Sequence, residues 1–540
     1  MSMKANLVLH NGQVVTVNDG MPTAKAVAVF GDRIALVGGE HQVADAIGPQ
    51  TEVIDLKGCA LLPGFSDAHC HITHYGMSLA QIDCRPGVVR DLDQITTQVR
   101  EEAARTPQDH WIRGRGYDDT RLPPKFAIDR YDLDRVSPRH PTCLTRVCGH
   151  VMVVNSRALA LAGIASETPD PPGGQIDRDA NGEPTGVLRE TALDLIHNVI
   201  PPPTVEEIEA SILRAARGYL SAGITSIHNA GTEAPEFTAF QRLRDRGLLP
   251  LRACLMVQPE ALGCFIGTGL YTGFGDEWLR IGALKIMLDG GIGARTAAVG
   301  QGFLGQPNNR GILWMTQDEL DELVQRAACA GFQIATHAIG DRAIESALDA
   351  YDRALRRQPR TGHRFRIEHC GLPLHGLKGR LAAMGVVASV QPTFLREMGD
   401  SYFKSLGEER GHQVLPLRSL IDFGVPLAGG SDSPVSTFAP LKGIAAAASR
   451  LTQDGQIIGP GQEISVEEAI RMYTKGGAYA SFEERIKGSI EVGKLADLVV
   501  LDRNPLETPV AEIPSITVVL TVLGGKIVYR NEQASTLISN

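Results

Sequence analysis

The chain has 540 residues, of which 43% are hydrophobic and 21% are charged, and its formal net charge is −9 at pH 7. This length is too great for one ordinary domain and predicts a large core with one or two appended units. The charges are interspersed, which excludes the basic stripe that nucleic-acid binding requires, and no apolar run reaches the roughly 18 residues of a membrane span. We therefore expect a small-molecule substrate, no nucleic acid and no membrane.

The segment MSMKANLVLHNGQ at the start lacks the apolar stretch of a signal peptide, which favours a cytoplasmic location. The nine cysteines form no CxxC pair and lie in apolar contexts such as LRACLMV and QRAACAG. We expect them to be buried, unpaired thiols in a reducing compartment. A homodimer is left open as the assembly.

Short β patterns separated by turn residues fill the first 62 residues, with turns expected at Asn11-Gly12 and Gly31-Asp32. The same texture returns near the C-terminus in ADLVVLD (496–502), SITVVLTVLGG (515–525) and KIVYRN. We predict that 1–63 and 485–540 form one composite β-sandwich domain. The alternative is two separate hairpins that pack on the core.

Eight apolar, strand-like segments alternate with helical patterns between these ends. The predicted strands are 61–69, 223–230, 251–257, 279–288, 332–337, 364–369, 386–392 and 425–432. Three of the intervening helices begin with a capping box, at Thr204, Thr316 and Ser465. This alternation predicts an α/β fold, a distorted TIM (β/α)8 barrel built from 64–75 and 222–484, with its chemistry at the C-terminal ends of the strands.

The gap between the first two predicted strands is far longer than the others, which predicts a large insertion after barrel strand 1, over 76–221. Loop signals such as PDPPGG and IPPP lie within it. We expect this subdomain to act as a lid or a substrate wall at the barrel mouth.

The stretch PGFSDAHCH places His69 and His71 one residue apart at the end of the first barrel strand. Side chains at i and i+2 of a strand point to one side, about 6.6 Å apart, so that both can bind one metal ion. The motif alone is weak evidence, because two histidines at this spacing also occur by chance.

Four further residues of metal-binding type belong to other predicted strands: Lys285, His337, His369 and Asp432. In a barrel these side chains converge on one axis, and imidazoles with a carboxylate suit a divalent transition metal, above all zinc. The alternatives are ordinary structural histidines and a simple turn at GGSDSP. For Lys285 the two readings are a carboxylated lysine that bridges two metals, and a lysine paired with Asp289.

The motifs PGFSDAHCH, IATHAIGDRA (334–343), RIEHCG (366–371), GGSDSP and GKLADLVVLDRNPL (493–506) together resemble those of the amidohydrolase superfamily. The insertion motifs GHVMVVNSRAL (149–159) and PTGVLRE (184–190), together with LKIMLDGGIGARTAA (284–298) of the predicted barrel, are similar to those of the branch of YtcJ-like amidohydrolases and N-substituted formamide deformylases, amidohydrolase family 3. The resemblance runs along nearly the whole chain.

The resemblance implies a metal-dependent hydrolase of carbon–nitrogen bonds other than peptide bonds, with one or two divalent ions per chain, most simply zinc. The residues that match the family's ligand positions are His69, His71, Lys285 (a candidate N6-carboxylysine), His337, His369 and Asp432. A bound divalent ion lowers the pKa of water to about 7 and supplies hydroxide. Asp432 is the expected proton carrier, with His369 as the second catalytic candidate. One departure is Asn229, where relatives tend to carry Asp and which cannot act as a base.

Candidate substrate-binding residues lie in the predicted loops and strand ends: Tyr117, His150, His228 and Arg295. The predicted reaction is hydrolysis of a small N-substituted amide by metal-activated hydroxide. The alternatives are a deaminase or a cyclic amide or imide hydrolase on the same site and, in another class, a non-catalytic scaffold with this fold. The sequence does not identify the substrate.

Overall fold

The computed structural model describes residues 4–118 and 128–539. The chain divides into two compact units, one formed by Met1–Ile72 with Ala215–Asn540 and the other by Thr73–Arg214. The predicted insertion, 76–221, overlaps the second unit. Within the described ranges, no helix is both long enough and apolar enough to cross a membrane.

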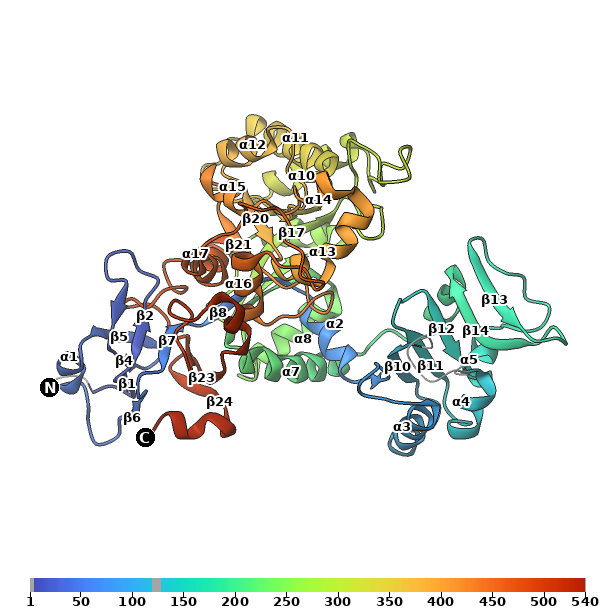
Figure 1. Cartoon of the computed structure of the whole chain (residues 1–540), viewed down its shortest axis with the longest axis horizontal. Coiled ribbons are helices and arrows are strands. Elements are labelled where there is room, and N and C mark those ends of the chain that lie inside the picture. Colours follow the sequence, from blue (N-terminus) through green and yellow to red (C-terminus); the bar gives the residue numbers. More distant parts are fainter. Residues whose placement is uncertain (1–3, 119–127, 540) are drawn as a thin grey trace. The chain divides into compact units, whose positions relative to one another are not determined.

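An eight-stranded parallel sheet forms the centre of the first unit, with the strand order β21-β20-β19-β18-β17-β16-β15-β8 (Figure 1). Its strands are β8 (Phe65–Cys70), β15 (Ile224–Thr232), β16 (Arg252–Val257), β17 (Leu279–Met287), β18 (Ile334–Ala338), β19 (Arg366–His369), β20 (Val387–Val390) and β21 (Leu427–Gly429). The last strand approaches the first, where the backbone N–H groups of Ser431 and Asp432 donate to the carbonyl of His69 at 3.2 and 2.7 Å. The nearly closed sheet confirms the predicted (β/α)8 barrel.

The predicted first strand, 61–69, is divided in the structure at Gly64. Residues before it form β7 (Ala60–Pro63), which belongs to the sandwich, and residues after it form β8. The N–H of Gly64 donates to Asp497 of the sandwich, and the next N–H donates to Gly223 of the barrel. A Cβ at position 64 would lie 2.4 Å from Thr225 Oγ1, so the crossing point has no room for a side chain.

Helices connect the barrel strands and cover the outside of the sheet. They are α7 (Val205–Ser221), α8 (Ala234–Asp245), α9 (Leu262–Thr268), α10 (Gln317–Cys329), α11 (Asp341–Arg357), α12 (Leu377–Met384), α13 (Thr393–Leu406), α14 (Glu408–Gly411), α15 (Leu417–Asp422), α16 (Pro440–Ser449), α17 (Val466–Arg471) and α18 (Gly477–Ala480). The three predicted capping boxes are confirmed, because the side chains of Thr204, Thr316 and Ser465 each accept from the N–H three residues on.

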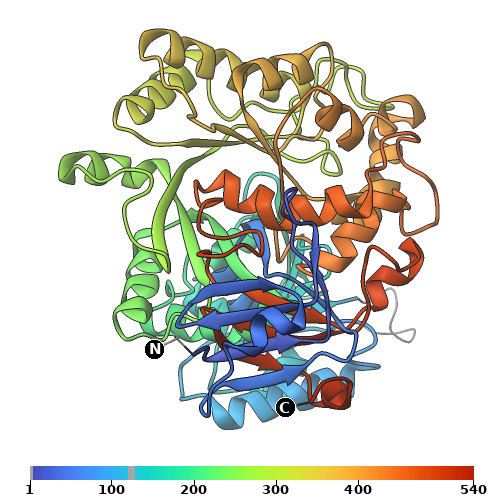
Figure 2. The ribbon, with the colours of Figure 1, turned by 90° about the vertical axis from the view of Figure 1, so that its left-hand side faces the viewer.

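Strands from both chain ends build two further sheets around one apolar core (Figure 2). One sheet contains β1 (Leu7–His10), β4 (Ala26–Phe30), β5 (Arg33–Gly38) and β6 (Glu52–Asp55), with α1 (Glu40–Ala44) packed beside it. The other contains β2 (Gln13–Val15), β3 (Thr23–Ala24), β7, β22 (Leu498–Leu501), β23 (Val518–Leu523) and β24 (Lys526–Arg530). Because β7 pairs with β22, the two ends of the chain share one sheet, and the alternative of two separate hairpins is excluded.

The predicted turn at Gly31-Asp32 joins the antiparallel pair β4 and β5, and the predicted turn at Asn11-Gly12 joins β1 and β2, which do not pair with each other. There β1 pairs with β4 and β6, whereas β2 pairs with β3 and β7 in the other sheet. Asn11, with a φ of 55°, turns the chain from one layer of the sandwich to the other. A turn residue therefore marked the corner correctly without indicating which strands pair.

The second unit contains a six-stranded sheet with the order β13-β14-β12-β11-β10-β9. Its strands are β9 (Ile82–Asp83), β10 (Ile112–Tyr117), β11 (Thr142–Arg146), β12 (Val151–Val154), β13 (Gly174–Arg178) and β14 (Pro184–Glu190). Its helices are α2 (Ile72–Ser78), α3 (Leu92–Arg105), α4 (Arg130–Val136), α5 (Ser156–Leu161) and α6 (Asp194–His197). Two apolar clusters give this unit its own core.

All nine cysteines are free thiols, and six of them are buried. The expectation of burial is wrong for Cys148, Cys264 and Cys329, which are exposed. Cys329, in QRAACAG, is the last residue of the amphipathic helix α10 and lies on its outer side, where small apolar neighbours do not imply burial.

Candidate metal centre

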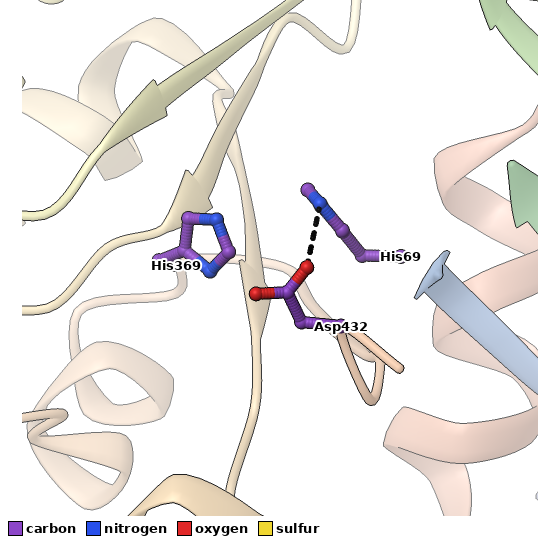
Figure 3. Close-up of side chains that lie close together, drawn as sticks. All are labelled: His69, His369 and Asp432. Carbon is purple, nitrogen blue, oxygen red and sulfur yellow. Dashed lines mark ion pairs between the residues drawn. The ribbon is translucent and has the colours of Figure 1, made fainter. Parts of the chain in front are cut away.

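Three side chains from separate strand ends meet at the C-terminal edge of the barrel: His69, His369 and Asp432 (Figure 3). Their ligand atoms all lie within 4.8 Å of one another. His69 lies near the end of β8, His369 ends β19, and Asp432 follows β21, so that parallel strands bring them to one place. The backbone of His369 and Asp432 is left-handed, with φ of 70° and 56°, a strained conformation that often marks a functional site.

His71, the second histidine of the HxH motif, contacts the same carboxylate. Its Nε2 lies 3.1 Å from Asp432 Oδ1, and His69 Nε2 lies 3.6 Å from that oxygen. Burial alone raises the pKa of Asp432, but the His71 hydrogen bond and the neighbouring histidines His369 and His69 outweigh it and hold that pKa below its ordinary value. Asp432 is therefore a carboxylate, the form that binds a cation.

His69 is prepared to bind a cation through Nε2. Burial lowers the pKa of its imidazole to about 3, with a further contribution from Lys285, so the ring is neutral and carries one proton. Nδ1 faces Glu368 Oε2 at 2.5 Å, which places that proton on Nδ1. Buried Nε2 then has a free lone pair, with no hydrogen-bond partner among the described residues. A buried lone pair beside a second imidazole and a carboxylate fits a divalent ion.

His369 is held in the same way by a neutral partner, because its Nδ1 lies 2.8 Å from Gln391 Oε1. Burial lowers the pKa of His369. Gln391 is itself 1% exposed and follows β20. Both imidazoles are thus neutral and have Nδ1 occupied, which leaves Nε2 of each ring for a metal.

Lys285 on β17 is 4% exposed, and burial lowers its pKa. Its Nζ lies 3.5 Å from Met287 Sδ, and within the described ranges no carboxylate lies close enough to form an ion pair with it. The predicted alternative partner, Asp289, instead accepts from the N–H groups of Ala298, Ile339 and Gly340 at 2.9 to 3.0 Å. Reading Lys285 as half of a salt bridge with Asp289 is therefore wrong.

His337, at the end of β18, borders the cluster. Its ring centroid lies 4.5 Å from that of His369, while its Nε2 faces Gly290 O at 3.4 Å and Asp289 Oδ1 at 3.5 Å. Burial holds the pKa of His337 well below its ordinary value, so that this imidazole is also neutral. Its place in the ligand set stays a prediction, because Nε2 faces these two oxygens.

The four predicted substrate-binding residues occupy different surroundings. His228 is fully buried on β15 with Nδ1 2.9 Å from Arg366 Nη1, and half-buried Arg295 donates to the carbonyl of Lys404 at 3.3 Å. In the second unit, exposed His150 faces Glu190 at 2.9 Å, and Tyr117 belongs to an apolar core. Their roles stay predictions.

Several residues that shape the centre were not predicted as site residues. Glu368 lies within β19 and Gln391 directly after β20, both in segments that the sequence predicts as strands. For Glu368, the available signal was an acidic residue next to a histidine at the end of a strand. Asp67, two residues before His69, accepts from Ser431 N and Oγ at 2.9 and 2.6 Å and so ties β8 to the segment that carries Asp432.

Asn229 has a structural role. Its Oδ1 accepts from the N–H of Ile72 at 3.1 Å, and its Nδ2 donates to Thr232 Oγ1 at 2.9 Å. The side chain is 1% exposed and fixes the chain just after the HxH motif. An amide, which donates and accepts at once, satisfies both neighbours without any acid function.

A small cavity of about 20 Å³ adjoins His369, with room for about one water molecule. Its walls are mostly apolar and come from the loops after β17, β18 and β19, from α13 and from the segment between α14 and α15. They include Ile292, Ile339, Phe394, Leu395, Tyr402 and Leu415. A small apolar group beside the cluster would therefore meet apolar surroundings.

Comparison with known proteins supplies an independent view of the chain. A family model described as "Amidohydrolase family" matches residues 52–529. The chain is 32% identical to Bacillus subtilis YtcJ, over 98% of this chain and 99% of YtcJ. It is 31% identical to the N-substituted formamide deformylase of Arthrobacter pascens, over 98% and 99%. A solved structure of a metal-dependent hydrolase from Pyrococcus furiosus covers 93% of this chain and all of that one, with a TM-score of 0.79 and 30% identity.

Proposed function

Because the chain belongs to the amidohydrolase family, we propose that it is a metal-dependent hydrolase that cleaves the carbon–nitrogen bond of a small N-substituted amide. One observation carries this proposal. The donor atoms of His69, His369 and Asp432 lie within 4.8 Å of one another, and the buried Nε2 of His69 has no hydrogen-bond partner among the described residues. Such a cluster at the C-terminal end of a barrel is where this fold carries out chemistry.

The proposed ligand set extends this cluster with three neighbours: His71, His337 and a carboxylated Lys285. The contact of His71 with Asp432 and the ring contact of His337 with His369 support their inclusion. The set of imidazoles and a carboxylate suits zinc, with one or two ions per chain. Bound there, a divalent ion supplies Lewis acidity toward the scissile carbonyl and a water acidified to a pKa of about 7.

We propose that Asp432 is the main residue that transfers protons in this reaction. Its carboxylate is ionised and only 9% exposed, and it is held by His71 Nε2, so it can accept a proton from the attacking water. The same group can return this proton to the departing nitrogen. Amide cleavage needs this proton because an amine leaves far more readily when protonated than as its anion. His369 is held by Gln391 through Nδ1, and we propose that it lines the same reaction space.

The name of the Arthrobacter relative supports N-substituted formamides as the first substrates to test. The small apolar cavity beside His369 supports a substrate with a compact apolar part. His150, His228, Arg295 and Tyr117 stay candidate substrate-binding residues, and we propose no specific substrate contact for any of them.

The test is hydrolysis by the zinc-supplemented protein of N-alkyl and N-aryl formamides, N-acyl amino acids and cyclic imides, measured as released amine and acid. We expect amine release from at least one formamide, and release slowed by roughly 10² to 10⁴ in the Asp432→Asn variant. Release of ammonia from heterocycles alone would identify a deaminase. A well-folded protein that binds no transition metal would favour the hypothesis of a non-catalytic scaffold and contradict the proposal.

A further inference from the structure

A fully buried carboxylate, Glu368, lies directly behind the candidate metal centre on β19. Its Oε2 accepts from His69 Nδ1 at 2.5 Å and from Arg366 Nη2 at 3.0 Å, and its Oε1 accepts from Arg366 Nε at 2.7 Å. Glu368 and His69 are 0% exposed, and Arg366 is 1% exposed. Burying these charged groups away from water costs free energy, which their contacts with one another must offset.

We propose that Glu368 is a positioning residue that makes His69 a stronger metal-binding histidine than His369, an inference that rests on the proposed metal-dependent function. A ring nitrogen that donates to a carboxylate fixes the tautomer and the orientation of the imidazole and raises the basicity of the other nitrogen. That other nitrogen is Nε2, which lies 3.6 Å from Asp432 Oδ1. Glu368 would act on a bound ion only through His69, whose Nδ1 it contacts.

Arg366 keeps this carboxylate in place from the opposite side. Beyond Glu368, its guanidinium donates to the carbonyl of Ala68 at 2.7 Å and lies 2.9 Å from His228 Nδ1. An arginine can only donate, so His228 Nδ1 accepts and the proton of this imidazole is on Nε2. His228 thus belongs to the support of His69, and the four side chains form one chain of contacts inside the barrel.

The corresponding position behind His369 carries no charge, because Gln391 Oε1 occupies it at 2.8 Å from Nδ1. Hydrogen bonds to an ionised acceptor are about twice as strong as those between neutral groups. The two imidazoles therefore differ in strength, with His69 the firmly held ligand and His369 the one that yields more readily. Gln391 provides a matched control, since it has the same function behind the other ring.

The experiment compares Glu368→Gln with Gln391→Glu, two exchanges that keep side-chain size and the acceptor for Nδ1 while moving the charge. Zinc affinity is measured by competition with a chelator, and the visible spectrum of the cobalt-loaded protein reports ligand geometry. We expect Glu368→Gln to weaken zinc binding by about 10- to 100-fold and to change the cobalt spectrum. We expect Gln391→Glu to bind zinc at least as tightly as the wild type. Equal zinc affinity in Glu368→Gln and the wild type would overturn the proposal.

Glu368→Gln leaves the charge of Arg366 buried without its partner, so this variant can fail to fold for that reason alone. The double variant Arg366→Met with Glu368→Gln removes the charge as well, and thermal unfolding reports whether it is folded. In addition, nitrogen-15 NMR of the wild type is expected to show the Nδ1–H tautomer of His69. The Nε2–H tautomer, or a doubly neutral variant that binds zinc as tightly as the wild type, would refute the role of Glu368.

These measurements need no substrate, which separates this inference from the proposed function. A wild-type protein that binds no metal would contradict the proposed function. A wild type that binds zinc tightly, together with a folded Glu368→Gln variant that binds it equally well, would remove only the positioning role.

Discussion

The backbone N–H of Asp432 donates to the carbonyl of His69 at 2.7 Å, so the barrel closes at two of its candidate metal ligands. A second contact next to this one joins Asp67 to Ser431, where the hydroxyl donates at 2.6 Å. The position of the carboxylate relative to the HxH motif is therefore fixed by the seam of the sheet, before any ion binds.

Replacing either histidine of the HxH motif should remove metal and activity together. His69→Ala deletes the buried Nε2, and His71→Ala deletes the 3.1 Å partner of Asp432. Neither ring can take over the position of the other, because each has its own contacts. Metal content by mass spectrometry and amide hydrolysis would test this, with His375→Ala, a largely exposed histidine, as the control. Wild-type metal content in either variant would remove that residue from the ligand set.

Asp432→Asn should preserve the fold and much of the bound metal while lowering kcat by roughly 10² to 10⁴, the usual range for a lost general acid–base group. An amide is similar in size and can still contact His71 Nε2, but it cannot accept and return a proton. Steady-state kinetics with a hydrolysed formamide would measure the change. A near-normal kcat would mean that another group carries the proton.

Lys285 distinguishes a one-metal centre from a two-metal centre. If it is carboxylated, the protein should contain about two metals per chain, and a crystal structure should show a planar carboxylate beyond Nζ. Lys285→Ala should then lose one metal and most activity, and a short carboxylic acid should restore part of it. The motivation is a buried lysine with Met287 Sδ at 3.5 Å and no carboxylate pair in the described ranges. One metal with an unmodified lysine would refute the bridge.

Asp67 should make the stability of the metal-free protein depend on pH. Burial raises the pKa of Asp67 to about 7, against an ordinary value of 3.8. A raised folded pKa gives stability that is complete below about pH 3.8 and is lost as the pH rises through 7. The loss is at most about 1.4 kcal/mol per pH unit. Other titrating groups act on both proteins, so the comparison is with Asp67→Asn, which should lack this loss. Urea unfolding between pH 4 and pH 8, after chelation, would measure it, and equal slopes would contradict it.

Much of the architecture could be predicted because the sequence pattern and the fold obey the same physical rules. Eight apolar segments separated by capped helices specify parallel strands, and strand ends then bring His69, His369 and Asp432 together. What the pattern could not supply was the partner of each strand. The turn at Asn11-Gly12 is real, yet the strands on its two sides belong to different sheets, since pairing depends on the whole core.

The contacts that support the candidate metal centre could not be predicted from the sequence either. Arg366 and Glu368 read as ordinary charges in RFRIEH, and only the barrel shows that both side chains point inward to His69 and His228. For Lys285, the neighbouring Asp289 was a reasonable partner by position. Its carboxylate instead accepts hydrogen bonds from three backbone N–H groups, and no residue pattern predicts such contacts.

The closure of the barrel by its first and last strands also has a consequence for biosynthesis. Translation proceeds at about 5 to 20 residues per second, so the HxH segment leaves the ribosome on the order of tens of seconds before Asp432 is made. The pairing of β7 with β22 adds a second dependence, because an N-terminal strand waits for one near the other end of the chain. A nascent or truncated chain therefore displays an unpaired apolar strand and an incomplete ligand set. The complete ligand set therefore requires synthesis as far as Asp432, and the pairing of β7 requires synthesis as far as β22.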